Sequence, residues 1–114
     1  MPRCIFCQIA AHEKPAAILY EDERCVVFRD INPKAPVHFL VIPRTHIASL
    51  NDDLETDKEL LGHMLVIAGR MAKEQGIDGP GYRTVINTNA EAGQSIFHLH
   101  FHILGGRILR WPPG

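Results

Sequence analysis

A strict alternation of histidine with apolar residues near the C-terminus constrains the fold more than any other feature of this chain. Residues 98–104 read HLHFHIL. Successive side chains of a β-strand point to opposite faces, so the three imidazoles share one face at a spacing of roughly 6.6 Å and the apolar side chains share the other. The pattern predicts a strand over Phe97–Leu104 whose apolar face packs into a core.

The rest of the chain predicts the elements that surround this strand. Leucine, isoleucine, methionine and alanine recur at three-to-four spacing and indicate a long helix, with Thr56 and Glu59 as a capping box and Gly76 as its stop. Segments rich in β-branched and aromatic residues indicate four further strands. The predicted order is strands at Ile18–Tyr20, Cys25–Arg29 and Val37–Ile42, a helix at Thr56–Gln75, and strands at Tyr82–Asn87 and Phe97–Leu104. This order predicts an α+β fold with an antiparallel five-stranded sheet: a three-strand meander, one long helix and two more strands.

Length and composition limit the classes of protein. A chain of 114 residues holds one domain, predicted over residues 1–114 with an N-terminal segment at 1–14 and a tail at 105–114. Twelve Lys and Arg against thirteen Asp and Glu give a net charge of −1, so no overall basic field favours nucleic acid as a partner. The apolar runs are too short for a membrane span or a signal peptide, and the cysteine count of three is odd, so we expect a cytoplasmic protein.

The chemistry of the histidine face has two interpretations. Imidazoles crowded on one face lower one another's pKa, and a neutral imidazole is a nucleophile, a hydrogen-bond acceptor or a ligand for zinc. The sequence contains no Asp or Glu from Ala92 to Gly114, although such side chains commonly orient zinc-bound histidines. The turn Ala92–Ser95, taken alone, is an ordinary hairpin turn. Beside three histidines, its backbone N–H groups, which are expected to be bare, and its hydroxyl favour a site for a phosphate.

Two cysteines close to the N-terminus form a separate signal. Cys4 and Cys7 have the spacing of half a tetrahedral zinc site, which needs two further ligands, and the alternative is a pair of buried thiols. Cys25 lies within a strand pattern and is predicted to be a buried thiol. His12 and His63 have no evident partner in the sequence.

Several long motifs resemble the histidine triad superfamily of nucleotide hydrolases and transferases. They are RDINPKAPVHFLVIPRTHI from Arg29, LLGHMLVIAGRMA from Leu60, GYRTVINTN from Gly81, AGQSIFHLHFHILGGR from Ala92 and the terminal WPPG. The chain is most similar to the branch of histidine triad nucleotide-binding proteins, which are purine nucleoside phosphoramidases. The resemblance implies a homodimer that joins its sheets across a helix and a strand, with a purine nucleoside monophosphate site in each half.

The resemblance also implies roles for individual residues. His100 matches the nucleophile that attacks the α-phosphorus, and His102 matches the residue that hydrogen-bonds the phosphoryl oxygens. His38 matches a buried histidine that relays a proton, although a hydrogen-bonded core histidine is an equal alternative. The other matches are Ser95, Gly93, Gln94 and Asn87 for the phosphate, Asp30 for the ribose, Phe6, Ile9, Phe28 and Ile31 for the base, and Trp111 for the leaving-group pocket of the partner subunit.

The resemblance implies no cofactor for catalysis, but a structural zinc ion held by Cys4, Cys7, His46 and His98. Many proteins of the branch have Gly where this chain has Ala92, and a left-handed backbone there would cost about 1 kcal/mol. The expected reaction is hydrolysis of purine nucleoside 5′-phosphoramidates or of acyl- and aminoacyl-adenylates. The alternatives are hydrolysis of dinucleoside polyphosphates, and a non-catalytic nucleotide sensor or protein-interaction module.

Overall fold

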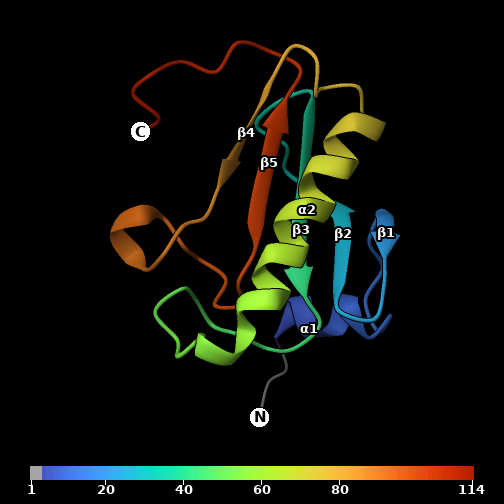
Figure 1. Ribbon diagram of the computed structural model, residues 1–114, viewed down its shortest axis with the longest axis vertical. Helices are drawn as coiled ribbons and strands as arrows, with labels where there is room; N and C mark the ends of the chain where they lie inside the picture. Colours follow the sequence, from blue (N-terminus) through green and yellow to red (C-terminus); the bar gives the residue numbers. More distant parts are fainter. Residues whose placement is uncertain (1–3) are drawn as a thin grey trace.

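The computed structural model describes residues 4–114 and contains a five-stranded sheet with two α-helices (Figure 1). The elements are α1 (Ile5–Ala10), β1 (Ile18–Glu21), β2 (Cys25–Arg29), β3 (Val37–Pro43), the 3₁₀ turn η1 (Glu55–Asp57), α2 (Lys58–Glu74), β4 (Tyr82–Val85), the 3₁₀ turn η2 (Ala90–Ala92) and β5 (Phe101–Gly105). No helix within residues 4–114 combines the length and the apolar character that crossing a membrane requires.

The sheet is antiparallel throughout, with strand order β1-β2-β3-β5-β4. The first three strands form the predicted meander, and β5 inserts between β3 and β4. His102 lies opposite Leu40 of β3 on one side and Val85 of β4 on the other, so the third histidine of the motif lies on an interior strand that is paired on both sides. The predicted fold class and the predicted order of strands and long helix along the chain are confirmed.

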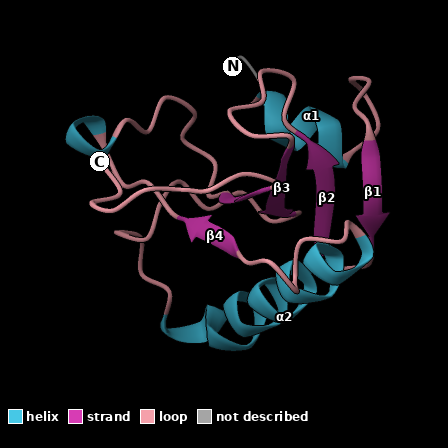
Figure 2. Ribbon diagram, turned by 90° about the horizontal axis from the view of Figure 1, so that it is seen from above, coloured by secondary structure: helices cyan, strands magenta, loops and turns pink. Residues whose placement is uncertain are grey.

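Each face of the sheet carries its own apolar cluster and its own helix. α2 packs over one face, where Leu99, Phe101 and Ile103 join the main core with Met64 and Ile67. The opposite face carries a second cluster that includes Phe6, Ile9 and Phe28 and is covered by α1. Figure 2 shows the two helices on opposite sides of the sheet. The period-two pattern of residues 98–104 therefore holds, because its apolar members lie under α2.

The predicted strand at Phe97–Leu104 begins too early, since β5 starts at Phe101. β3 ends at Pro43, which has no N–H to donate to a sheet ladder. Beyond that point the Leu99 N–H donates to the Ile47 carbonyl at 2.6 Å, and His98 Nε2 lies 2.8 Å from the Pro43 carbonyl. Leu99 thus bonds to the segment that follows β3, and the His98 side chain bonds to the last residue of β3. The strand expected at Tyr82–Asn87 likewise ends early, at Val85.

The long helix is confirmed, but the predicted capping box is wrong. Residues 55–57 form a separate 3₁₀ turn, so Thr56 lies ahead of the helix and α2 begins at Lys58 without a side-chain cap. The predicted stop is correct: Gly76 has φ +75°, its N–H donates to the Lys73 carbonyl at 3.1 Å, and the Ile77 N–H donates to the Ala72 carbonyl at 3.0 Å. This pair of bonds is a Schellman motif.

Helix α1 was not predicted from the sequence. Its buried residues Phe6, Ile9 and Ala10 follow a spacing of i, i+3 and i+4, so the apolar pattern of one helical turn was present in the N-terminal segment. Six residues are too few for this signal to stand out against an irregular segment. The helix nevertheless determines the site, because Cys4, Phe6 and Cys7 lie on it or at its start.

Candidate active site

The histidine face of the sheet brings three imidazoles, those of His38, His100 and His102, into contact on the side covered by α1. The ring centroids of His100 and His102 are 4.9 Å apart, and those of His38 and His102 are 5.2 Å apart. His98 lies beyond His100 and is fully buried. All three histidines of the motif therefore share one side, as predicted, although only His102 lies in a paired strand.

Hydrogen bonds assign the proton of His100. Its Nδ1 lies 2.7 Å from the His98 carbonyl oxygen, which can only accept a hydrogen bond. Nδ1 therefore carries the proton in the neutral ring, and Nε2 keeps its lone pair. An imidazole with a free Nε2 lone pair is a competent nucleophile.

A second chain of bonds assigns the protons of His38 and His102. The backbone N–H of Lys34 donates to His38 Nδ1 at 3.0 Å, so the neutral His38 ring carries its proton on Nε2. That Nε2–H donates to His102 Nδ1 at 3.0 Å, and Asp30 Oδ2 lies 3.3 Å from the same nitrogen. His102 is consequently protonated on Nε2, which gives it a donor N–H next to the His100 ring.

Burial keeps the His38 and His102 rings neutral. Desolvation, together with the neighbouring His100 and His38, lowers the pKa of His102 to about 4 against an opposing effect of Asp30. Desolvation also lowers the pKa of His38, with Asp30 again opposing it. These rings thus hold the proton pattern of the neutral tautomers at neutral pH.

The low pKa of His102 predicts acid sensitivity of the fold. Because the folded pKa of about 4 is below the ordinary value of 6.5, the unfolded chain binds a proton that the folded chain does not as the pH falls through this window. We expect His102 to account for about 2 kcal/mol of the unfolding free energy lost between pH 7 and pH 4. Denaturant titrations at both pH values should show a smaller loss in His102→Gln. Equal losses in variant and wild type would contradict the prediction.

The predicted base-binding residues are only partly brought together. Phe6, Ile9 and Phe28 are almost completely buried in one cluster, and the Phe6 ring meets the His100 ring edge-on at a centroid distance of 5.2 Å. Ile31, in contrast, is fully exposed and lies outside this cluster. Phe6 thus lies beside His100, whereas Ile31 does not join the buried base-binding residues.

The loop before the motif differs from the predicted phosphate cradle. The N–H groups of Gly93 and Gln94 donate to the carbonyls of Ala90 and Asn89 at 3.0 and 3.1 Å, so the expectation that they are bare is wrong. The Gln94 side chain is buried and bridges the Asn89 N–H and the Ala48 carbonyl. Ser95 is exposed, and within residues 4–114 neither its hydroxyl nor its N–H forms a hydrogen bond.

Two other residues of the predicted phosphate site can be placed. Asn87 is half-buried and follows β4 on the way to this loop. Ala92 is not in the left-handed region, which Gly93 occupies with φ +88°, so the strain considered for Ala92 does not arise. Ser95 is therefore the group of this loop best placed to meet an anion.

Cys4, Cys7, His46 and His98 form the predicted metal-ligand group. Their ligand atoms lie within 4.8 Å of one another. His98 Nδ1 is 3.4 Å from Cys4 Sγ and 3.5 Å from Cys7 Sγ, and His46 Nδ1 is 3.3 Å from Cys7 Sγ. A tetrahedral zinc site with normal bond lengths has ligand atoms roughly 3.5 Å apart, so the four residues fit the ion.

The protonation of His98 also fits a metal ligand. Its Nε2 carries the proton because it donates to the Pro43 carbonyl, and this leaves the Nδ1 lone pair facing both sulfur atoms. Desolvation by burial lowers the pKa of His98 to about 4. His98 therefore faces the cysteines and not the His100 ring nitrogen that carries the free lone pair.

The remaining predicted residues lie outside this cluster. Cys25 is fully buried, as predicted, and burial raises the pKa of its thiol to about 12. The expectation that His12 and His63 lack partners is wrong, because they lie 2.8 Å from Glu21 and 2.7 Å from Asp22. Trp111 is 80% exposed in the C-terminal tail.

Comparisons with known proteins define the family. A family model described as "Scavenger mRNA decapping enzyme C-term binding" matches residues 3–108. An HIT-like protein from Synechocystis is 52% identical over 110 residues, which are 96% of each chain. The structure of an HIT family hydrolase from Legionella pneumophila is 47% identical and superposes with a TM-score of 0.96 over 98% of this chain and all of that chain.

Two further solved structures are similar. A histidine triad nucleotide-binding protein from Candida albicans is 31% identical with a TM-score of 0.82, over 96% of this chain and 83% of that chain. A zinc-bound histidine triad family protein from Mycobacterium smegmatis is 35% identical with a TM-score of 0.78, over 91% and 75%. The chain belongs to the histidine triad (HIT) family.

Proposed function

We propose that the protein is a nucleotide-binding hydrolase that cleaves purine nucleoside 5′-phosphoramidates, or acyl- and aminoacyl-adenylates, through a nucleotidyl–His100 intermediate. The main support is the protonation of two neighbouring rings. His100 has a lone pair at Nε2 that can attack phosphorus, and His102 has a proton at Nε2 that can be donated. The similarity to an HIT family hydrolase and to a histidine triad nucleotide-binding protein supports the choice of reaction and ligand.

In the proposed first step, His100 Nε2 forms a bond to the α-phosphorus and the bond from phosphorus to the leaving nitrogen breaks. The departing amine takes up a proton from solvent, whereas an acyl- or aminoacyl-adenylate loses its carboxylate through cleavage of the P–O bond and needs no such proton. A water molecule later displaces the imidazole, releases a proton to solvent and gives the nucleoside monophosphate. His102 donates its Nε2–H to a phosphoryl oxygen and so stabilises the charge that develops there. No step requires a metal ion.

His38 acts in this proposal by orienting His102. The Lys34 N–H holds His38 Nδ1 as an acceptor, so the ring has one proton and directs it at His102. A shuttle would leave His38 negatively charged after giving up that proton, which its buried position opposes. The geometry therefore favours a fixed hydrogen bond over the proton relay considered from the sequence.

The test compares two substrate classes. We expect adenosine 5′-phosphoramidate to be hydrolysed to AMP at least roughly 100-fold more efficiently than a dinucleoside triphosphate, measured as kcat/KM. The reverse preference would support the dinucleoside polyphosphate alternative. Nucleotide binding without turnover of either compound would support the non-catalytic sensor.

We also propose a homodimer. Leu65 and Val66 on α2 are 50% and 62% exposed, and Tyr82 on the edge strand β4 is 39% exposed, so an apolar surface continues from the helix to an unpaired strand edge. Light scattering at micromolar concentration should give the mass of two chains, and Val66→Glu should shift it to one. A single-chain mass for the wild type would contradict the proposal.

Removal of residues 111–114 should alter the preference for the leaving group and leave the mass measured by light scattering unchanged.

A further inference from the structure

Helix α1 carries several residues of the site, but its own hydrogen bonds and caps give it little stability. It places Phe6 against His100, and it sets Cys4 and Cys7 at the Nδ1 atom of His98. A helix of six residues is too short to persist alone in water, and α1 has no side-chain cap at its N-terminus. Contacts from outside the helix must therefore fix its position.

Arg44 supplies such contacts at the C-terminal end of α1. Its Nη1–H donates to the Ala10 carbonyl at 2.7 Å, one of the carbonyls that a helix end leaves without an internal partner. Its positive charge also lies at the negative end of the helix. Arg44 thus gives the Ala10 carbonyl a hydrogen-bond donor, and its positive charge interacts favourably with the partial negative charge at the C-terminal end of α1.

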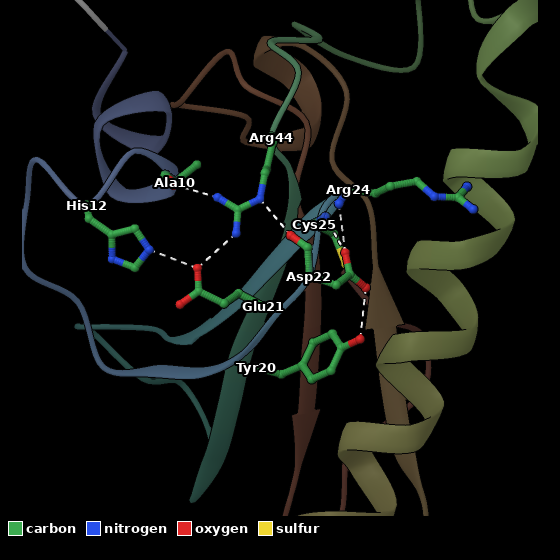
Figure 3. Close-up of polar contacts among 8 residues, drawn as sticks. All are labelled: Ala10, His12, Tyr20, Glu21, Asp22, Arg24, Cys25 and Arg44. Atoms are coloured by element: carbon green, nitrogen blue, oxygen red, sulfur yellow. Dashed lines mark hydrogen bonds and ion pairs between the residues drawn. The ribbon is translucent and has the colours of Figure 1, made fainter.

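The same guanidinium joins α1 to the turn between β1 and β2. Nε–H donates to the Asp22 carbonyl at 2.7 Å, and Nη2–H donates to Glu21 Oε1 at 2.8 Å. Figure 3 shows Arg44 between Ala10 on one side and the turn on the other, with His12 reaching the same Glu21 carboxylate. Three nitrogens therefore bind three separate backbone or carboxylate acceptors, an arrangement that the fixed fork of Arg makes possible and a single Lys ammonium does not.

We call the three hydrogen bonds of the Arg44 guanidinium the Arg44 clamp. The backbone of Arg44 holds this clamp at the end of β3. Its N–H donates to the Arg24 carbonyl at 2.9 Å, and the residue before it is Pro43, whose carbonyl binds His98. The clamp thus starts from the end of β3 that also sets the His98 ring, and it reaches across to the helix that faces that ring.

We propose that Arg44 is a positioning residue that holds α1, and with it Phe6 and the Cys4–Cys7 pair, against the histidine face whether or not a metal ion is bound. The part that concerns nucleotide binding rests on the function proposed above. Without Arg44, the Ala10 carbonyl and the Glu21 carboxylate lose a donor, and α1 loses its hydrogen bond to the residue that follows β3. In the wild type, a metal ion bound by Cys4 and Cys7 and the Arg44 guanidinium would independently hold the two ends of this short helix.

Amide hydrogen exchange of the full chain tests this clamp directly, both as purified and after chelation. The reporters are the N–H groups of Gln8, Ala11 and His12, which bond to the carbonyls of Cys4, Cys7 and Ile9. In the chelated protein we expect Arg44→Ala to speed their exchange by roughly tenfold or more, and Arg44→Lys to speed it by roughly threefold. Amides of α2 should be unaffected, which shows that the variants remain folded.

Arg24→Ala is the matched control, because Arg24 belongs to the same turn and its side chain points toward α2 in Figure 3. It should leave exchange in α1 unchanged. If Arg44→Ala does not fold, the lysine variant decides the test. Exchange in α1 as slow as in the wild type in the chelated Arg44 variants would overturn the proposal.

A kinetic measurement separates this proposal from the proposed function. We expect Arg44→Ala to raise KM for adenosine 5′-phosphoramidate by roughly tenfold and to change kcat by less than roughly threefold, because Phe6 shifts while His100 and His102 remain in place. Absence of turnover in the wild type would refute the proposed function and leave the exchange result valid. A fall in kcat with unchanged KM would contradict the positioning role.

Discussion

His100→Ala is expected to lower kcat for adenosine 5′-phosphoramidate by at least roughly 10⁴-fold while nucleotide affinity changes only a few-fold. The substitution removes the Nε2 lone pair that forms the bond to phosphorus. It leaves the Phe6 ring, the Ser95 hydroxyl and the Asp30 carboxylate in place. Turnover is measured by release of AMP, and affinity is measured by calorimetric titration with AMP.

His102→Ala is the matched comparison, because it removes a neighbouring imidazole from the same face. This variant should be slower by roughly 10²- to 10³-fold but still active, since it loses a hydrogen bond to a developing charge and not the reacting atom. An inactive His102 variant beside an active His100 variant would reverse the two roles. Full activity in His100→Ala would refute the covalent mechanism.

The second large effect concerns the proposed zinc ion. Protein purified without added metal should contain one zinc per chain, and the double variant Cys4→Ser, Cys7→Ser should contain none. We expect the double variant to lose on the order of 3 kcal/mol of unfolding free energy and to bind nucleotide more weakly. It should still turn over substrate, because the ion would be held at His98, whereas the proposed reaction needs His100 and His102.

Cys25→Ala is the control for this experiment. Cys25 is buried under α2 and apart from the four ligands, so the variant should lose stability and retain its zinc. A metal-free wild type that is as stable and as active as the purified protein would contradict the zinc proposal. In that case Cys4 and Cys7 serve only as packing residues.

The sequence predicted the parts of the fold that depend on periodicity. Alternation in residues 98–104 predicted which side chains enter the core, and the spacing of apolar residues predicted α2, because burial of one face determines both patterns. The error in the predicted start of β5, at Phe97 and not at Phe101, has a different cause. Pro43 ends the ladder on β3, and this is a pairing effect that the pattern within residues 97–100 does not contain.

The site was predictable in its residues and less so in its bonds. The CxxC spacing and the motif resemblance brought Cys4, Cys7, His46 and His98 together, and the structure places all four within reach of one ion. The Gly93–Gln94 N–H groups are used within their own loop, which depends on the backbone turn at Asn89 with φ +64°. Arg44 gave no signal at all, since its three acceptors come from segments that only the fold brings together.

The protons of the histidine cluster are set by main-chain groups, and this has a consequence for how the site tolerates change. The Pro43 carbonyl, the His98 carbonyl and the Lys34 N–H each contact one ring. The carbonyls are present whatever side chain the residue carries, and the N–H is present with any residue but proline at position 34. Substitutions at positions 34 and 43 that preserve the backbone path therefore leave the tautomers intact. The nitrogen chemical shifts of the imidazoles should therefore change little with such substitutions. The side chains at these positions can be varied without reversing the donor and acceptor roles of the histidine rings.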